Sequence, residues 1–299
     1  MMIVRLSGGL GNQLFQFAAA KSLEYKYGGN VIIDDSYYSN QPSKDTLRKL
    51  EVFQFKISFT RKSNHKEQKK IRSKVFLIKL LNRIPGIIKP TVNHNVLRLI
   101  NVYSESAFLL KDTPKDDDCI IGYFQNYDFL KDSIDEIREQ FTLTPEVEKE
   151  VQRLNTYHFI SSHKNTVAVH IRRGDYVTNA NASAYHGLCD MDYYKAAINL
   201  ITERTSAPRF VFFSDDIDWV RSAFAWVPNA FFSDNDVSLY SAIDMYLMSI
   251  CKNNIIANST YSWWGAVLNT DPNKIVICPK RWTLKDDIDQ LYVDGWVKI

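Results

Sequence analysis

The second half of the chain alternates short apolar runs with segments of helical length, and this alternation limits the folds that it can adopt. The apolar runs cover residues 167–171, 209–213, 230–232, 254–257 and 274–278, and the helical segments cover residues 191–203, 216–225, 238–250 and 260–269. Strands that are apolar on both faces are typical of a parallel sheet covered by helices on both sides. The pattern therefore predicts an α/β fold built on a doubly wound, Rossmann-like sheet.

The N-terminus opens with a similar strand–helix–strand unit. A short apolar strand at residues 2–6 leads into the glycine-rich turn Ser7–Gly11, and Asn12 is expected to cap a helix over residues 13–27. Two glycines end that helix, and a second strand follows at residues 31–33. We therefore expect two Rossmann-like domains, residues 1–155 and residues 156–299, that face each other across a cleft.

Polar clusters follow three of the apolar runs in the second half. These clusters are His170, Arg172, Arg173 and Asp175; Ser214, Asp215 and Asp216; and Asn258, Ser259 and Thr260. Because ligands of doubly wound sheets bind at the carboxyl ends of the strands, we expect the three clusters to converge on one site.

The residue types in the clusters favour a nucleoside diphosphate. Two adjacent arginines repel each other, and their guanidinium groups match phosphate oxygens bidentately. Hydroxyl groups at a helix N-terminus form a second anion site, and carboxylates accept hydrogen bonds from ribose hydroxyls or from the N–H edge of guanine. The alternatives are a pair of surface arginines beside a surface aspartate, and a plain N-cap at Ser214–Asp216. The convergence of three clusters favours the nucleotide pocket.

The glycine-rich turn near the N-terminus permits two interpretations. Gly9 and Gly11 with Asp34 half-match a dinucleotide fingerprint, but Leu14 occupies the third glycine position. No Gly-Lys-Ser/Thr follows, so the turn is not a P-loop. We prefer a tight turn that brings its backbone and Asn12 close to a ligand, and an NAD-dependent oxidoreductase remains the alternative.

Five motifs strongly resemble those of the bacterial α-1,2-fucosyltransferases. They are SGGLGNQLFQFAAA (7–20), GYFQ (122–125), HIRRGDY (170–176), FSDD (213–216) and NSTYSWWGAVLN (258–269). The resemblance implies an inverting, metal-independent glycosyltransferase of the GT-B fold. Such an enzyme moves L-fucose from GDP-fucose, its donor substrate, to the 2-hydroxyl of a sugar, commonly galactose, in α-1,2 linkage during surface glycan (O-antigen) synthesis. It needs no cofactor.

The resemblance also implies roles for the motif residues. His170 and Arg172 would hold the ribose and diphosphate region of the donor, and Arg172, aided by Arg173, would neutralise the β-phosphate as GDP leaves. Asp215 or Asp216 would read guanine, Ser259 and Thr260 would bind the phosphates, and Asn12 would lie near the fucose. The expected donor-binding set also contains Gly9, Gly11, Ser214 and Asn258.

Several questions about the motifs stay open in the sequence. Asp175 and His186 are candidates for the base that takes the acceptor proton, and a surface charge or a satisfied imidazole explains each equally well. Trp263 and Trp264 are expected to pack in the core rather than to stack on a sugar. A non-catalytic nucleotide-sugar binder is a further alternative. A metal site on Asp116–Asp118 or on Asp216 and Asp218 is disfavoured.

Composition and charge narrow the choice of compartment and partners. The 299 residues are 45% hydrophobic, and the net charge of +3 argues against a nucleic-acid partner. The four cysteines form no CxxC pair, and no run reaches the length of a signal peptide or a membrane-spanning helix. We therefore expect a cytoplasmic protein that acts on a galactose-containing oligosaccharide or a lipid-linked glycan.

Residues 61–98 form a strongly basic stretch that also contains apolar residues. Eleven lysines and arginines stand there against Glu67 as the one acid. One interpretation is a basic amphipathic helix that lies on anionic lipid headgroups, which would place the enzyme peripherally on the inner face of the membrane. The other is a solvated helix whose apolar stripe joins the core, and we favour this second interpretation.

Overall fold

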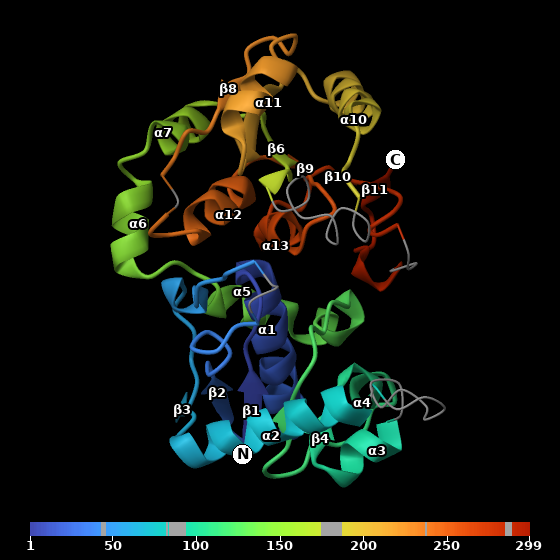
Figure 1. Cartoon of the computed structure of the whole chain (residues 1–299). Helices are drawn as coiled ribbons and strands as arrows, with labels where there is room; N and C mark the ends of the chain where they lie inside the picture. Colours follow the sequence, from blue (N-terminus) through green and yellow to red (C-terminus); the bar gives the residue numbers. More distant parts are fainter. Residues whose placement is uncertain (43–45, 82, 84–93, 175–186, 237, 285–288) are drawn as a thin grey trace. The chain divides into compact units, whose positions relative to one another are not determined.

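The structure is a computed structural model that describes residues 1–42, 46–81, 83, 94–174, 187–236, 238–284 and 289–299. The chain divides into two compact units, Met1–Phe141 and Thr142–Ile299 (Figure 1). The division thus falls earlier than the boundary expected between residues 155 and 156. Its physical reason is packing, because helices α6 (Pro145–Val151) and α7 (Asn155–Ser162) both contact α12 (Ala242–Ser249) of the second unit.

The first unit contains a parallel sheet with strand order β3-β2-β1-β5-β4. Its elements are β1 (Met2–Arg5), α1 (Leu10–Tyr27), β2 (Val31–Asp34), β3 (Arg61–Lys62), α2 (His65–Leu81), α3 (His94–Leu99), β4 (Val102–Tyr103), α4 (Glu105–Leu109), β5 (Cys119–Ile120) and α5 (Ile134–Gln140). The apolar strands and the inner face of α1 are buried, as the parallel pattern predicted.

Helix α1 begins earlier than the sequence pattern indicated. Gly9 is the residue before the helix, and Gly8 adopts a left-handed φ of 79° that lets the chain turn from β1 into Leu10. Asn12 therefore lies within the first turn, where its N–H donates to the Gly9 carbonyl, and it does not cap the helix. The helix ends at Gly28, which also has a positive φ, as expected.

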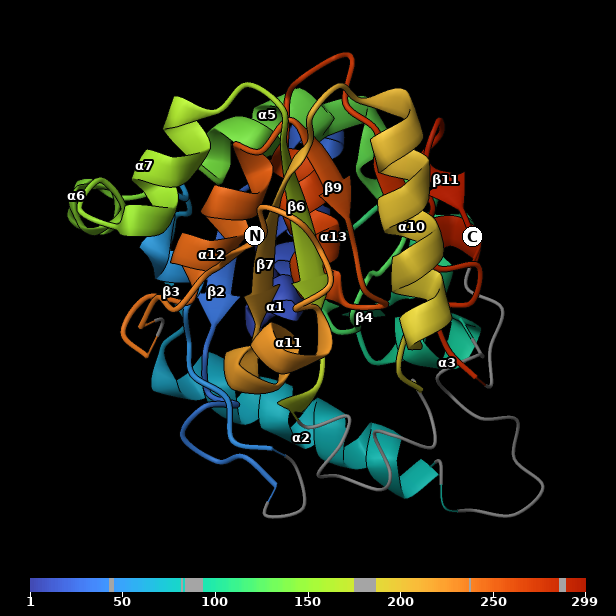
Figure 2. The ribbon, with the colours of Figure 1, turned by 90° about the horizontal axis from the view of Figure 1, so that it is seen from above.

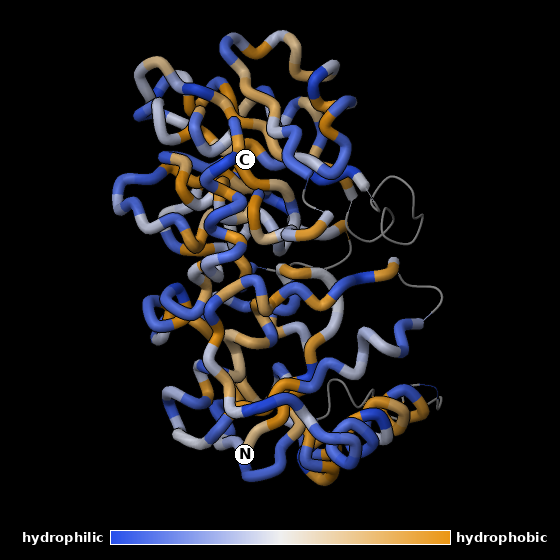
Figure 3. The backbone as a smooth tube through the Cα atoms, turned by 90° about the vertical axis from the view of Figure 1, so that its left-hand side faces the viewer, coloured by the Kyte–Doolittle hydropathy of each residue, from blue (hydrophilic) through white to orange (hydrophobic). Residues whose placement is uncertain are grey.

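Helix α2 covers the basic stretch and has two different faces. Ile71 is buried, and it packs with Val75 against Ile3 and Ile32 in the core of the first unit. The favoured interpretation, an apolar stripe that joins the core, is confirmed for this face. Other residues of α2 are exposed, and Figure 3 shows apolar and polar residues side by side along the helix.

The second unit is a six-stranded sheet with order β11-β10-β9-β6-β7-β8, in which all paired strands run parallel. Its strands are β6 (Thr166–Ile171), β7 (Arg209–Ser214), β8 (Phe231–Phe232), β9 (Asn253–Ile255), β10 (Val276–Cys278) and β11 (Val297–Lys298). Helices α10 (Met191–Arg204), α11 (Ile217–Ala223), α12 and α13 (Thr260–Leu268) pack on these strands (Figure 2). The predicted α/β architecture is thus observed in both units.

The two tryptophans of α13 belong to the core. Trp263 and Trp264 are fully buried, and their ring centroids lie 5.0 Å apart in an edge-to-face arrangement. The indole N–H of Trp263 donates to the Leu291 carbonyl at 2.6 Å. The expectation of core packing is therefore confirmed.

Gln13 on α1 is a buried polar anchor for the loop after β2. Its amide nitrogen donates to the carbonyls of Gly8 and Lys49, and its amide oxygen accepts from the N–H groups of Glu51 and Val52. The Gln13 side chain is fully buried, and all four of its hydrogen bonds go to backbone groups.

We expect Gln13→Leu to destabilise the protein, because it removes the partner of four backbone groups while keeping an apolar stem. The unfolding free energy should fall by about 2–4 kcal/mol, which is the cost of stranding such groups. Denaturant titration measures the change, and Gln152→Leu at an exposed position is the matched control. Equal stability of the two variants would show that Gln13 does not hold the loop.

Candidate functional site

The described residues of the three polar clusters lie at one edge of the second sheet. Strand β6 pairs with both β7 and β9, so the carboxyl ends of these three strands are neighbours. The ring of His170 lies 5.7 Å from the ring of Tyr261, and Arg172 contacts Asp215. The structure therefore brings the clusters together as the sequence predicted.

Asp215 holds the turn that follows β6 through both of its carboxylate oxygens. Oδ2 accepts a hydrogen bond from Nη1 of Arg172 at 2.5 Å, and Oδ1 accepts from the backbone N–H groups of Arg173 at 2.9 Å and Gly174 at 3.0 Å. A Cβ atom on Gly174 would lie 2.3 Å from Oδ2, so only glycine permits this approach. Asp215 therefore organises residues 172–174, which we call the arginine turn, and the sequence did not indicate this role.

Arg173 is held by a carboxylate and by an aromatic ring. Its Nε donates to Oδ2 of Asp216 at 3.0 Å, and its guanidinium carbon lies 3.6 Å from the ring centroid of Trp219 on α11. Asp216 precedes α11 but makes no side-chain capping bond, and its own N–H donates to Oγ of Ser214 at 3.1 Å. The plain N-cap interpretation is thus wrong for Asp216, and Trp219 is a contact that the sequence analysis missed.

Two carboxylates therefore compensate the two adjacent arginines. The side chains of Arg172 and Arg173 are 20% and 19% exposed, so both positive charges are partly removed from water. A guanidinium has five N–H donors, which exceeds what one carboxylate satisfies, so these ion pairs are compatible with binding a further anion. The arrangement fixes both guanidinium groups in place before any ligand arrives.

His170 is buried within the same edge. Burial lowers its pKa to about 4, against the opposing attraction of Asp215, so the imidazole is neutral at physiological pH. Its Nδ1 is buried and has no hydrogen-bond partner among the described residues. Tyr194 fixes the backbone there by donating its hydroxyl to the His170 carbonyl at 3.1 Å.

The third cluster divides into anchoring and exposed groups. The amide of Asn258 donates to the carbonyls of Gly187 and Trp282, so the side chain supports neighbouring loops. Ser259 is the N-cap of α13, and its Oγ accepts from the N–H of Tyr261 at 3.3 Å. Thr260 is partly exposed at the first position of the helix.

Asp244 is a buried carboxyl group that the sequence analysis missed. Its Oδ1 accepts hydrogen bonds from Asn235 at 2.8 Å and from Ser233 at 3.4 Å, just after β8. Burial raises the pKa of Asp244 to about 6, and the two hydrogen bonds oppose that rise. The signal in the sequence was an acidic residue in the otherwise apolar segment AIDMYLM (242–248).

In the first unit, the glycine-rich turn presents Asn12 at the start of α1. Oδ1 of Asn12 accepts a hydrogen bond from the side-chain amide of Gln125 at 2.9 Å, which joins the turn to the GYFQ motif. A Cβ atom on Gly8 would lie 2.8 Å from the Asn12 amide nitrogen. Gly9 precedes the helix and Gly11 is buried in its first turn.

Both candidates for the base, Asp175 and His186, lie outside the described residues. Among the described residues, no cluster of histidines, cysteines and acids could hold a metal ion. Asp116 pairs with the N-terminal amine and Asp118 with Arg98, so both carboxylates of that possible metal site are engaged.

Within the part of the chain that the structure describes, no helix combines the length and apolarity needed to cross a bilayer.

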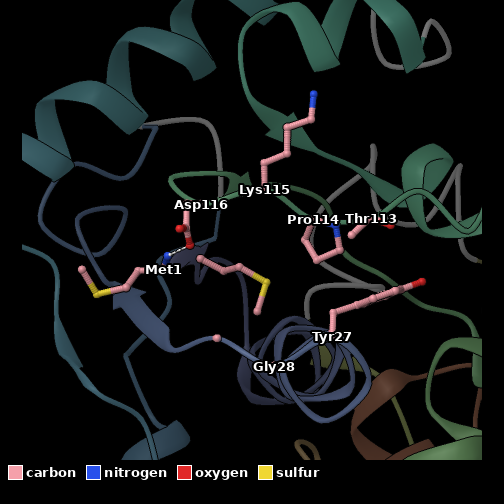
Figure 4. Close-up of a pocket in the computed structure, with 9 residues that line it drawn as sticks. Met1, Tyr27, Gly28, Thr113, Pro114, Lys115 and Asp116 are labelled. Carbon is pink, nitrogen blue, oxygen red and sulfur yellow. Dashed lines mark hydrogen bonds and ion pairs between the residues drawn. The ribbon is translucent and has the colours of Figure 1, made fainter.

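A pocket in the first unit lies at the opposite edge of its sheet. Figure 4 shows that Met1, Gly28 and Asp116 line it, and these residues lie next to the amino ends of the strands. Ligands of doubly wound sheets bind at the carboxyl ends, so this pocket is not part of the predicted site.

The family model for glycosyl transferase family 11 matches residues 1–299. The chain belongs to this family. It is therefore a glycosyltransferase, which favours the transferase over the oxidoreductase and over the non-catalytic binder. The structure adds the arrangement of residues 170–174 of the HIRRGDY motif with the FSDD and NSTYSWW motifs at one sheet edge.

Three relatives illustrate the range of the family. The chain is 40% identical to the O-antigen biosynthesis glycosyltransferase WbnK of Escherichia coli, over 98% of this chain and 99% of that protein. It is 30% identical to an alpha-1,2-colitosyltransferase of Escherichia coli, over 100% and 99% of the two chains. It is also 32% identical to the galactoside 2-alpha-L-fucosyltransferase Sec1 of Mus musculus, over 49% of this chain and 41% of that one.

A solved structure shares the fold. A mutant of Arabidopsis thaliana FUT1 in complex with GDP superposes with a TM-score of 0.52 at 12% identity, covering 92% of this chain and 69% of that chain. The predicted GT-B-like fold, with two Rossmann-like sheets, is therefore confirmed.

We expect Asp244→Asn to remove a pH-dependent loss of stability. The carboxyl of Asp244 holds its proton up to a pH of about 6 in the folded state, but only to about 4 when unfolded. The wild type should therefore lose stability relative to the variant as the pH rises from 4 to 6, on the order of 3 kcal/mol, and the difference should stay constant above 6. Unfolding titrations of both proteins across this range measure the difference.

The matched control for this measurement is Asp192→Asn, because the Asp192 side chain is 92% exposed. Its stability should follow that of the wild type at every pH. A constant difference between Asp244→Asn and the wild type from pH 4 to 7 would mean that the buried carboxyl is not responsible.

Proposed function

We propose that this protein transfers L-fucose from GDP-fucose to the 2-hydroxyl of a galactose-containing acceptor, with inversion to an α-1,2 linkage. The observation that carries the proposal is the pair of fixed guanidinium groups, Arg172 and Arg173, at the sheet edge where α13 also begins. The full-length similarity to an O-antigen glycosyltransferase and the partial similarity to a galactoside 2-alpha-L-fucosyltransferase support it. The second unit would bind the donor and the first the acceptor.

In the proposed reaction, the oxygen of the acceptor 2-hydroxyl forms a bond to C1 of fucose. The bond from C1 to the β-phosphate oxygen breaks, its electron pair leaves with GDP, and the hydroxyl proton passes to a base. Negative charge therefore grows on the diphosphate, where Arg172 and Arg173 stabilise it without having to reorganise. The partly exposed Thr260 and the helix N-terminus would share that charge, and this makes a metal ion unnecessary.

The other predicted residues would then shape the donor site. Neutral His170 would face the ribose and diphosphate region, and Asn12 would face the fucose. Asp216 keeps a half-exposed side chain beside its ion pair, which makes it a better reader of guanine than Asp215. Ser214 and Asn258 would act through the loops that they hold.

A second donor deserves a test, because the colitosyltransferase matches the chain over its full length. The same diphosphate site suits a nucleotide-linked colitose. The two sugars would be distinguished by the part of the site that faces the donor hydroxyls rather than by the arginines.

We expect GDP to raise the melting temperature far more than UDP or NAD, because a ligand that binds only the folded state stabilises it. Transfer from GDP-fucose should exceed transfer from nucleotide-linked colitose and should survive EDTA.

Arg172→Lys should keep GDP binding but lose on the order of 2–4 kcal/mol of transition-state stabilisation, mainly in kcat, because lysine lacks the planar fork.

The outcomes of that experiment separate the parts of the proposal. Equal shifts from GDP, UDP and NAD would refute a guanine-specific site. Loss of activity in EDTA with rescue by manganese would refute the metal-free mechanism. A normal kcat in Arg172→Lys would reduce Arg172 to a binding residue.

We also propose that the protein works at the cytoplasmic face of the membrane, with α2 against anionic lipid. One face of α2 carries exposed residues spaced three or four apart, and Phe76 is 68% and Leu80 47% exposed on it. The exposed cations among them include Lys69, Arg72 and Lys79. An exposed apolar pair flanked by cations is typical of helices that lie in the headgroup region.

We expect the wild type to sediment with anionic vesicles at low salt and to be released at high salt, because the attraction is screened over about 8 Å at physiological ionic strength. Neutralising Lys69, Arg72 and Lys79 to glutamine should abolish sedimentation and leave transfer to a short oligosaccharide unchanged. The control changes Lys131, Arg153 and Lys195, which are exposed on other elements, and removes the same charge. Equal sedimentation of both triple variants would exclude a specific role for α2.

A further inference from the structure

The first unit, which would bind the acceptor in the proposed reaction, contains a sheet with a topological switch point. From β1 the chain adds β2 and β3 on one side, and β5 and β4 lie on the other side. In doubly wound sheets, ligands bind outside the carboxyl ends of the strands at the point where the order reverses. That point lies between the ends of β1 and β5, at Arg5 and Ile120.

Two amide side chains fix the loops on either side of this point. The Gln16 side chain donates to the Gly122 carbonyl at 3.1 Å and accepts from the Ser7 N–H at 2.8 Å. The Gln125 side chain donates to Asn12 at 2.9 Å. The loop after β1 and the loop after β5 are thus cross-linked twice, which gives a ligand site rigid walls.

Arg5 is the last residue of β1, before the first of these two loops, and its side chain has a hydrogen-bond donor without a partner among the described residues. Its Nε is buried without a hydrogen-bond partner among the described residues, and its guanidinium carbon lies 5.6 Å from the ring centroid of Tyr37. Buried donors of this kind are rare in native proteins, where nearly all find a partner. Asp34 stands opposite Arg5 in the register of β1 and β2, so an acidic residue lies beside the guanidinium and the position is not a strongly positive one.

Tyr123 adds an exposed aromatic ring after β5, the strand that pairs with β1. The side chain is 51% exposed, and Tyr123 lies three residues beyond Ile120, which pairs in register with Val4 next to Arg5. Its backbone is held because Oε1 of Glu105 accepts from the N–H groups of Tyr123 and Phe124, both at 2.7 Å. An exposed ring on a fixed backbone is suited to pack against the apolar face of a ligand.

We propose that Arg5 and Tyr123 form the binding site for the terminal galactose of the acceptor. The guanidinium donates to adjacent sugar hydroxyls with its fixed fork, and the tyrosine ring packs on the apolar face of the pyranose. A neutral sugar fits better than a phosphate, because the carboxylate of Asp34 offsets the charge of Arg5. The inference rests on the proposed function, since it names the acceptor site of that reaction.

The test compares Arg5→Lys and Tyr123→Ala with the wild type. We expect the KM for a galactoside acceptor to rise about tenfold or more in both, with the KM for GDP-fucose, the acceptor-independent hydrolysis of GDP-fucose and the thermal shift by GDP unchanged. Tyr123→Phe should retain normal kinetics, because the ring remains. Tyr27→Ala is the matched control, since Tyr27 is 36% exposed at the amino end of the same sheet.

Direct binding separates this proposal from the donor assignment. Saturation-transfer NMR with lactose should give a signal with the wild type, with Tyr123→Phe and with Tyr27→Ala, and none with Arg5→Lys or Tyr123→Ala. An unchanged lactose signal in both site variants overturns the proposal, as does the absence of a signal in the wild type. Loss of the GDP shift in the same variants also overturns it, because the residues would then serve the donor. Failure of GDP-fucose as a donor, with lactose binding lost in these variants, would refute only the proposed reaction.

Discussion

The ion pairs across β6 and β7 are the interaction on which the second unit depends for its chemistry. Two arginines in sequence repel each other, and a partly buried position makes that repulsion more costly. Asp215 and Asp216 at the end of the neighbouring strand compensate both charges, and Asp215 also accepts from two successive backbone N–H groups. The guanidinium groups are therefore held in place by the fold itself, which is what electrostatic catalysis requires.

Gly174 and Trp219 show how closely this arrangement is determined. A side chain at Gly174 would collide with the carboxylate that organises the turn, and the guanidinium carbon of Arg173 lies 3.6 Å from the ring centroid of Trp219. A change at either position would move a guanidinium without removing it. Small displacements of a catalytic group reduce the rate steeply. Substitutions at Gly174 or Trp219 should therefore slow the reaction, although neither residue carries a charge.

In both units, side chains hold the loops at the carboxyl ends of a parallel sheet in place, but the groups that do so differ. In the second unit two carboxylates fix the arginine turn and the amide of Asn258 supports neighbouring loops, whereas in the first unit the amides of Gln13, Gln16 and Gln125 hold the loops together with the carboxylate of Glu105. Neutral cross-links suit the recognition of an uncharged sugar, and ion pairs suit the recognition of a diphosphate. The difference agrees with a division of labour between acceptor and donor units, which remains our proposal.

The sequence by itself determined the class of fold and the neighbourhood of the site. Apolar runs have only one stable placement, inside a sheet covered on both faces, and polar residues at their carboxyl ends must then meet at one edge. The period-based pattern located β6, β7 and α10 closely, and the buried tryptophans of α13 followed from their apolar surroundings. These features depend on local periodicity and burial, which a sequence displays directly.

Tertiary structure alone decided which partner each polar group takes. The resemblance implied that Asp215 or Asp216 reads guanine, and the local pattern predicted Asn12 as a helix cap; contacts from distant segments engage Asp215 with the arginine turn and Asn12 with Gln125. The pKa of Asp244 and the position of the unit boundary were equally hidden, because both depend on packing between α12 and segments far from it in the sequence. Hydrogen-bond partners are chosen by distance in space, and that distance exists only once the chain has folded.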